Sequence, residues 1–263
     1  MRLVLLLFLA LAAPAAAAPL TDARTFALAL GDGAAAKVEG YDVVVVDGST
    51  PARRVKALRA DGAFVLGYLS VGTIESYRSW FAAAKPYRME LWDDWGEWYA
   101  RVSAPGFRRL IADRVAPAIM KRGFDGLFLD NVDMIDGHPG QAAGMRALVK
   151  RLAAGPGVLF AQNGDEIIDP FLRYLDGWNR EDVSRTYDFD RERYVAVPVA
   201  ESAAAQATLQ RLGERGLFVT ATDYVAAGDD AAAARAKRIA CDLGALSYVS
   251  DIGLRRVPPP SAC

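Results

Sequence analysis

Short runs of apolar residues recur along the chain, and within each run the apolar residues are nearly continuous rather than alternating with polar ones. Strands that are buried on both faces show this pattern, as in a parallel sheet covered by helices. We predict eight such strands, at residues 25–30, 41–47, 63–70, 126–130, 157–163, 174–178, 216–223 and 245–250.

Amphipathic segments lie between these strands and predict helices. Eight strands alternating with helices indicate a single α/β domain folded as a (β/α)8 barrel, or TIM barrel, with a doubly wound open sheet as the alternative. The connection at residues 71–106 is long and rich in aromatic residues, and we expect it to carry part of a binding surface. The helical segments cover residues 51–60, 107–123, 140–155, 202–216 and 231–244, and Gly123 is a plausible helix stop.

The first residues have the pattern of a secretory signal peptide. Arg2 precedes an apolar run that is too short to span a bilayer, and alanines follow it. We expect cleavage after Ala17, which leaves an exported barrel domain of residues 18–263 without membrane attachment, and we expect a monomer. In an oxidising compartment Cys241 and Cys263 could pair. The alternative is a buried thiol at Cys241 and a frayed end at Cys263.

Charge and histidine content exclude several function classes. The formal net charge is −1 over 263 residues, so no basic surface favours nucleic acid. The single histidine, His138, makes a multi-histidine metal site impossible and could serve at most one nucleophilic triad. No glycine-rich phosphate-binding motif follows a predicted strand. We therefore expect chemistry based on carboxylates, amides and aromatic rings, with no cofactor and no metal.

Polar residues cluster where the predicted strands end, and in a barrel these ends form the active site. Asp130 is the strongest candidate, because a carboxylate that ends an apolar strand is costly unless it is hydrogen-bonded. Glu181 lies in a polar loop beyond the predicted strand 174–178. Asp47 could instead close a turn, and Glu75 could pair with Arg78. The predicted binding residues are Asp47, Tyr68, Ser70, Glu75, Asn131, Asp133, Gln162, Asn163, Asp223 and Tyr224.

This mixture of side chains suits a sugar polymer. Pyranose rings present C–H faces that pack on aromatic rings, and their hydroxyls need many donors and acceptors. Glycoside hydrolysis needs two carboxyl groups and no metal. Two other readings stay open: a non-catalytic polysaccharide-binding protein on the same scaffold, and a hydrolase that uses its carboxylates to hold Mg²⁺ or Ca²⁺.

Five motifs in order along the chain resemble glycoside hydrolase family 114, the endo-α-1,4-polygalactosaminidases and their bacterial relatives. The resemblance covers roughly residues 24–254, and "GFDGLFLDNVDMID" is its most specific part. The motifs are "GYLSVGTIESYRSW", "GFDGLFLDNVDMID", "AQNGDEII", "DGWNREDVSRTY" and "TATDY".

The resemblance implies a (β/α)8 barrel with Asp130 and Glu181 as the catalytic pair. It also implies cleavage of α-1,4-linked, galactosamine-rich polysaccharide with retention at the anomeric carbon. Asp130 would then be the nucleophile and Glu181 the acid and base, with the reversed assignment of the two roles as the alternative. Two departures bear on substrate preference: Thr73 stands where many bacterial relatives carry a glutamate, and "EDVSRTYD" lacks an aromatic residue that often follows the glutamate.

Overall fold

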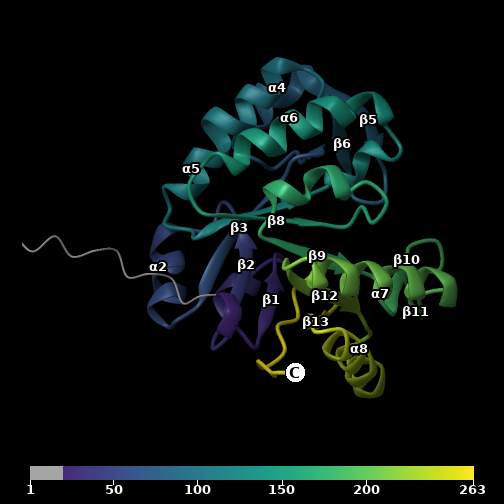
Figure 1. The fold of residues 1–263 in the computed structure, drawn as a ribbon. Coiled ribbons are helices and arrows are strands. Elements are labelled where there is room, and N and C mark those ends of the chain that lie inside the picture. The colour runs from purple at the N-terminus through teal and green to yellow at the C-terminus, as the bar shows by residue number, and fades with distance from the viewer. Residues whose placement is uncertain (1–19) are drawn as a thin grey trace, which may run out of the picture.

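A computed structural model describes residues 20–263, so the predicted signal peptide lies outside the described residues. Eight parallel strands form one sheet that curls into a nearly closed barrel (Figure 1). The spatial order of the strands follows the sequence, and β1 lies beside β13, so the (β/α)8 prediction is confirmed and the open sheet is wrong. The strands are β1 (Phe26–Ala29), β2 (Val43–Asp47), β3 (Phe64–Ser70), β7 (Gly126–Asp130), β8 (Val158–Gln162), β9 (Gly177–Glu181), β12 (Phe218–Tyr224) and β13 (Leu246–Ser250).

Aromatic side chains pack where the first and last strands meet. Phe26 of β1 and Tyr248 of β13 make an edge-to-face contact with ring centroids 6.3 Å apart. Tyr41, just before β2, packs against Tyr248 and donates its hydroxyl to the carbonyl of Pro258 at 2.7 Å. The C-terminal segment is thereby fastened along the junction between β1 and β13.

Helices connect most strands and bury their apolar sides against the sheet, as their spacing predicts. Gly123 ends the helical segment before β7 in the left-handed region, at φ 96°, which glycine adopts without steric cost. A π-helical turn at Ile111–Val115 joins α4 to α5. The helices are α1 (Ala34–Lys37), α2 (Ala52–Ala60), α3 (Phe81–Ala84), α4 (Pro105–Leu110), α5 (Ala116–Met120), α6 (Ala142–Ala153), α7 (Val199–Glu214) and α8 (Asp230–Asp242). None of the helices in the described part is long and apolar enough to cross a membrane.

Two insertions stand at the carboxyl ends of the barrel strands. The long connection after β3 folds into a three-stranded antiparallel sheet of β4 (Thr73–Ile74), β5 (Arg88–Trp92) and β6 (Glu97–Ala100). The connection after β9 forms a two-stranded hairpin of β10 (Arg185–Asp188) and β11 (Arg193–Ala196). Both lie toward the right of Figure 1.

The sixth barrel strand differs from the prediction of residues 174–178. It runs from Gly177 to Glu181, so Glu181 ends a strand rather than lying in a loop. Asn179 and Arg180 interrupt the apolar run, and this hid the end of the strand in the sequence. Asn179 is nonetheless fully buried inside the barrel, because neighbouring polar side chains satisfy its amide.

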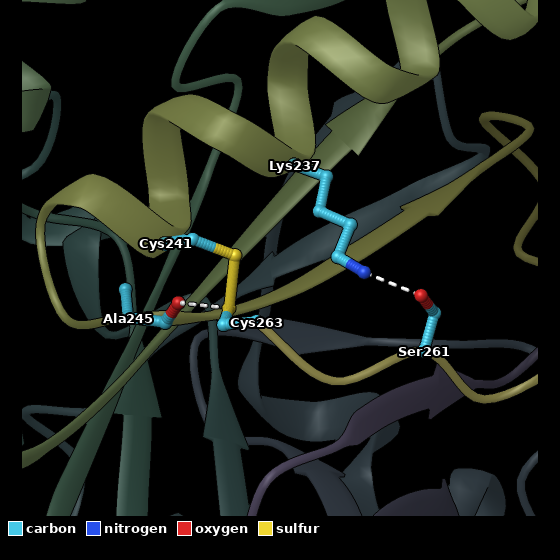
Figure 2. Close-up of a disulfide and its surroundings, with 5 residues drawn as sticks. All are labelled: Lys237, Cys241, Ala245, Ser261 and Cys263. Atoms are coloured by element: carbon cyan, nitrogen blue, oxygen red, sulfur yellow. Dashed lines mark hydrogen bonds between the residues drawn. A yellow bond between two sulfur atoms is a disulfide. The ribbon is translucent and has the colours of Figure 1, made fainter.

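A disulfide joins Cys241 on α8 to Cys263 at the C-terminus, so the pairing that the sequence left open is present (Figure 2). The two Cα atoms are 5.3 Å apart, within the usual range for a disulfide. Cys263 Sγ lies 3.6 Å from the carbonyl oxygen of Ala245, which immediately precedes β13. The bond therefore lies at the amino-terminal end of that strand, opposite the predicted site.

Candidate active site

A cleft of about 370 Å³ opens at the carboxyl ends of the barrel strands. Five carboxylates line it, and no lysine or arginine does so within residues 20–263. Nine of the predicted site residues also border it, together with four aromatic or acidic residues that the sequence reading did not single out. The first group comprises Asp47, Tyr68, Asp130, Asn131, Asp133, Gln162, Asn163, Glu181 and Tyr224, counting Asp130 and Glu181 as the predicted pair; the second comprises Tyr77, Trp92, Trp95 and Glu97.

Asp130, the last residue of β7, accepts three hydrogen bonds. Tyr68 Oη donates to Oδ2 at 2.5 Å, while Gln162 Nε2 and the Asn131 backbone N–H donate to Oδ1 at 2.5 and 2.7 Å. Burial raises the pKa of Asp130, and these three donors act in the opposite direction by stabilising the charged form. The carboxylate is therefore held in one orientation by two neighbouring strands.

A chain of buried amides orients the donor to Asp130. The hydroxyls of Thr220 and Thr222 donate to Asn179 Oδ1 at 2.8 and 3.1 Å, so the amide nitrogen of Asn179 points the other way. That nitrogen donates to Gln162 Oε1 at 3.1 Å, and this leaves the Gln162 nitrogen facing Asp130. Hydroxyl donors on β12 thus set the direction of a hydrogen bond on β7.

Glu181, the last residue of β9, has different partners. Tyr224 Oη donates to one carboxylate oxygen, and Asn163 Nδ2 donates to the other at 2.8 Å. Burial, followed by the nearby charges of Asp130 and Asp182, raises the pKa of Glu181 to about 8. Glu181 therefore carries a proton at neutral pH and can donate it.

The residues that follow the three central strands share an unusual backbone conformation. Asn131, Asn163 and Asp182 have φ angles of 58°, 58° and 54°, in the left-handed region that asparagine and aspartate tolerate best among non-glycine residues. Asn131 also donates through Nδ2 to Ser70 Oγ at 3.0 Å and to Thr73 Oγ1 at 3.1 Å. These two hydrogen bonds fix the turn after β7, which carries Asn131 next to Asp130.

The inserted sheet contributes a further carboxylate, Glu97. The Thr73 hydroxyl donates to Glu97 Oε2 at 2.7 Å, and so connects β6 to the end of β3. Burial and the charge of Glu75 raise the pKa of Glu97 to about 7. Asp133 also has a pKa of about 7, raised by burial and then by the charge of Asp130. These two groups change charge near neutral pH beside the predicted catalytic pair.

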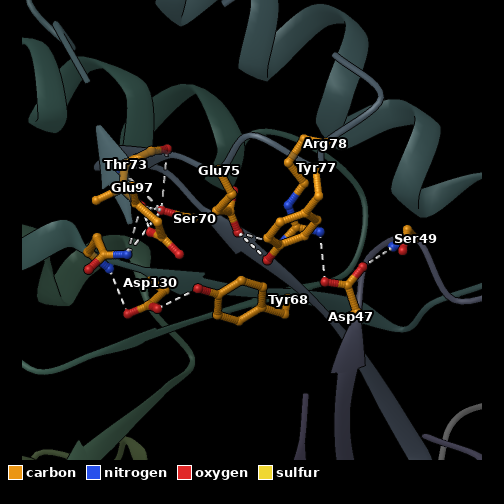
Figure 3. Close-up of polar contacts among 11 residues, drawn as sticks. Asp47, Ser49, Tyr68, Ser70, Thr73, Glu75, Tyr77, Arg78, Glu97 and Asp130 are labelled. Carbon is orange, nitrogen blue, oxygen red and sulfur yellow. Dashed lines mark hydrogen bonds and ion pairs between the residues drawn. The ribbon is translucent and has the colours of Figure 1, made fainter. Parts of the chain in front are cut away.

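A buried cation, Arg78, lies with its acidic partners beside the ends of β2 and β3 (Figure 3). Arg78 pairs with Glu75 Oε1 at 2.5 Å and with Asp47 Oδ2 at 2.6 Å. Its guanidinium also lies over the rings of Tyr77 and Tyr68, 4.8 and 5.6 Å from their centroids. Asp47 and Glu75 thus neutralise Arg78, which in turn packs against the tyrosine that contacts Asp130.

Three predicted binding residues do not line the cleft. Ser70 is fully buried and bonded to Thr73 at 2.6 Å. Glu75 is almost fully buried in its pair with Arg78, the alternative that the sequence left open. Asp223 accepts hydrogen bonds from the Ser184 and Arg185 N–H groups at 2.7 and 2.6 Å, and so anchors the β10–β11 hairpin. All three support the residues that line the cleft.

Glu97 is the residue that sequence reasoning missed. It lies within the aromatic stretch that was expected to face the site, but in a segment with several other acids nothing singled it out. Only the pairing of β4 with β6 brings it to the strand ends. Among the described residues, no group of three or more His, Cys, Asp and Glu side chains is arranged to hold a metal ion.

A family model and a bacterial relative match this chain in sequence. A model of the glycoside-hydrolase family GH114 matches residues 9–254. An uncharacterized protein of Deinococcus radiodurans is 32% identical over 152 residues, which is about half of this chain and about half of that protein (49% of each).

Two solved structures share the fold. The glycoside hydrolase domain of PelA from Pseudomonas aeruginosa superposes with a TM-score of 0.78 at 22% identity, over 90% of this chain and 98% of that one. Ega3 of Aspergillus fumigatus, crystallised in complex with galactosamine, has a TM-score of 0.71 at 18% identity, over 92% of this chain and 95% of that one.

Proposed function

This chain belongs to glycoside-hydrolase family GH114, and from that premise we propose that it is an exported enzyme that cleaves α-1,4-linked, galactosamine-containing polysaccharide with retention. It is an O-glycoside hydrolase. The observation that carries the proposed mechanism is the pair of carboxyl groups in one cleft, one accepting three hydrogen bonds and the other with a pKa of about 8.

In the first step, Asp130 attacks the anomeric carbon while Glu181 gives its proton to the departing glycosidic oxygen. A covalent glycosyl ester on Asp130 results. In the second step, the Glu181 carboxylate takes a proton from water, which attacks the same carbon and releases Asp130. The two inversions leave the anomeric configuration unchanged. Tyr68 and Gln162 stabilise the charge of Asp130 before attack and after release.

The charge of the cleft supports an amino sugar as substrate. Four carboxylates besides the protonated Glu181 face the cleft, and Arg78 beside it is already paired with Asp47 and Glu75. A protonated amine gains from this surplus of negative charge, and the attraction weakens as salt screens it. The galactosamine in the Ega3 crystal is consistent with this choice.

The test is to incubate wild type, Asp130→Asn and Glu181→Gln with an α-1,4-galactosamine polymer and measure new reducing ends, with and without EDTA. We expect cleavage by wild type and a loss on the order of 10²–10⁴-fold in either variant. Proton NMR of the first product formed reports its anomeric configuration. Full activity in either variant would refute the assignment, and activity abolished by EDTA would support a metal-dependent hydrolase instead.

The competing function is a polysaccharide-binding protein without catalysis. It predicts that wild type binds the polymer tightly but releases no reducing ends. The raised pKa of Glu181 favours the enzyme, because simple binding of a cationic sugar would use that carboxyl in the charged form.

A further inference from the structure

The proposed chemistry leaves an aromatic surface at the outer end of the cleft unused. Trp92 and Trp95 belong to the β5–β6 hairpin, and Phe189 lies in the turn between β10 and β11. Trp95 meets Phe189 edge to face with ring centroids 5.5 Å apart, and Trp92 lies 6.3 Å from Trp95. We call these three residues the aromatic rim. Two hairpins that are about ninety residues apart in the sequence thus build one surface.

Two residues of the aromatic rim are much more exposed to solvent than the aromatic residues of the core. Trp95 is 45% exposed and Phe189 is 39% exposed, whereas the large aromatics of the barrel are buried. Exposed aromatic groups rimmed by polar residues often mark binding surfaces. Asp93, Asp94 and Gly96 surround Trp95 in its turn, and all three are exposed.

Other rings hold the aromatic rim in place. Trp92 stacks on Tyr99 with planes 9° apart and centroids at 5.5 Å, and Phe189 packs against Tyr187 at 5.1 Å. Because these rings are already packed, a ligand that stacks on them loses little side-chain freedom. A fixed aromatic surface of this kind is preorganised for a flat apolar partner.

The rim is continuous with the catalytic cleft, since Trp92 and Trp95 line the same cleft as Asp130 and Glu181. A polymer bound across the two carboxyls must leave the cleft over some part of its edge. The C–H faces of pyranose rings fit aromatic rings, and the exposed Asp93 and Asp94 suit amine groups beside them.

We propose that the aromatic rim is a distal sugar subsite, which stacks a ring of the polysaccharide beyond those held at the scissile bond. The subsite gives the enzyme a preference for long chains over short ones. It rests on the proposed function for the identity of its ligand, an α-1,4-linked chain of pyranoses with free amines.

The experiment measures binding rather than turnover, in a Glu181→Gln background that does not consume the ligand. Calorimetry gives the affinity for a galactosamine trisaccharide and for a long galactosamine polymer. We expect Trp95→Ala and Phe189→Ala each to lower the ratio of polymer affinity to trisaccharide affinity by about 10-fold, which corresponds to about 1.4 kcal/mol. Trp95→Phe should retain most of the ratio.

Leu91→Ala is the matched control. Leu91 lies on the same hairpin and is as exposed as Trp95, at 45%, but it does not line the cleft. Its substitution should leave the ratio unchanged, and thermal unfolding should show that all variants are folded.

The outcomes separate this inference from the proposed function. If wild type cleaves the polymer but the rim variants keep the wild-type ratio, the subsite is refuted and the proposed function stands. If wild type binds without cleaving and the rim variants lower the ratio, the subsite stands and the enzymatic proposal fails. If no galactosamine ligand binds, both are refuted.

Discussion

The cleft is built by two regions that differ in how their side chains are held. At the barrel strand ends, Asp130 and Glu181 accept hydrogen bonds from side chains of adjacent strands, and buried amides fix those donors. In the inserted hairpins, by contrast, Trp95 and Phe189 are more than one-third exposed and rest mainly on one another and on other rings.

This difference matches two different requirements. Proton transfer and nucleophilic attack need carboxyl groups held in one orientation, which a network of hydrogen bonds across several strands provides. Contact with a long, repetitive polymer needs a large apolar contact area and does not require each side chain to have one exact orientation. We infer that chemistry belongs to the strand ends and that chain recognition belongs to the hairpins.

Apart from the catalytic pair, the largest effect should come from the barrel interior. Asn179→Ala removes the amide that links Thr220 and Thr222 to Gln162. Without it, Gln162 is free to turn its oxygen toward Asp130, and we expect kcat to fall roughly 10²-fold. Stability should fall by about 1–3 kcal/mol, because buried polar groups lose their partners.

Val219→Ala is the control for that experiment. Val219 is buried on β12 and pairs in register with Trp178 on β9, but no hydrogen bond of the amide chain involves its side chain. Denaturant unfolding gives the two stability losses. Equal kcat values for both variants would show that the amide chain serves stability alone.

A smaller effect should come from Glu97, the carboxylate that the inserted sheet contributes. Glu97→Gln removes one charge beside a cationic substrate, and kcat/KM for the galactosamine polymer should fall about 10-fold. The pKa of Glu97 is about 7, so wild type gains its charge, and its advantage over the variant, as pH rises through that value. The ratio of the two rates across pH measures this gain.

The fully N-acetylated polymer is the control substrate for Glu97→Gln, because it carries no positive charge. Its cleavage should show little difference between wild type and variant at any pH. An equal loss on both polymers would mean that Glu97 acts through its hydrogen bond with Thr73 and not through its charge.

The raised pKa of Glu181 predicts a smaller effect, in which the variant Glu181→Gln is more stable than wild type at high pH. Its folded pKa of about 8 lies above the unfolded value of about 4.3, so the folded state binds the extra proton between these values. The stability that this proton provides is complete below the unfolded pKa and is lost as pH rises through about 8. Glu181→Gln should therefore unfold a few degrees above wild type in alkaline buffer.

The same comparison in buffer below about pH 4 supplies the control, since both side chains are then neutral. There the two unfolding temperatures should agree. A constant difference at all pH values would show that the substitution acts through packing and not through protonation.

Removal of the disulfide tests whether a loss of stability far from the cleft changes kcat. Cys263→Ser opens a bond between residues 22 apart in sequence, and the free energy of unfolding should fall by up to about 3 kcal/mol. Because the bond lies at the opposite end of β13, kcat should not change at temperatures where both proteins are folded. A changed kcat would show that the two ends of the barrel are coupled.

Several parts of this description were predictable from the sequence. The doubly buried strands and the positions of Asp47 and Asp130 at strand ends follow from local patterns. The end of β9 could not be predicted, because the buried amide of Asn179 forms its hydrogen bonds with Gln162 and Thr220, which lie 17 and 41 positions away in the sequence. For the same reason, a list of strand-end residues could not separate those that line the cleft from Ser70, Glu75 and Asp223, which support it.

By itself, the sequence determined the barrel and the edge at which its polar residues gather, since strand periodicity and the common direction of parallel strands are local properties. Only the tertiary structure decided the protonation of Glu181, because its pKa of about 8 depends on burial and on the charge of Asp130, two strands away. It also decided that Trp95 and Phe189 form one surface, because their contact depends on how two distant insertions fold over the same strand ends.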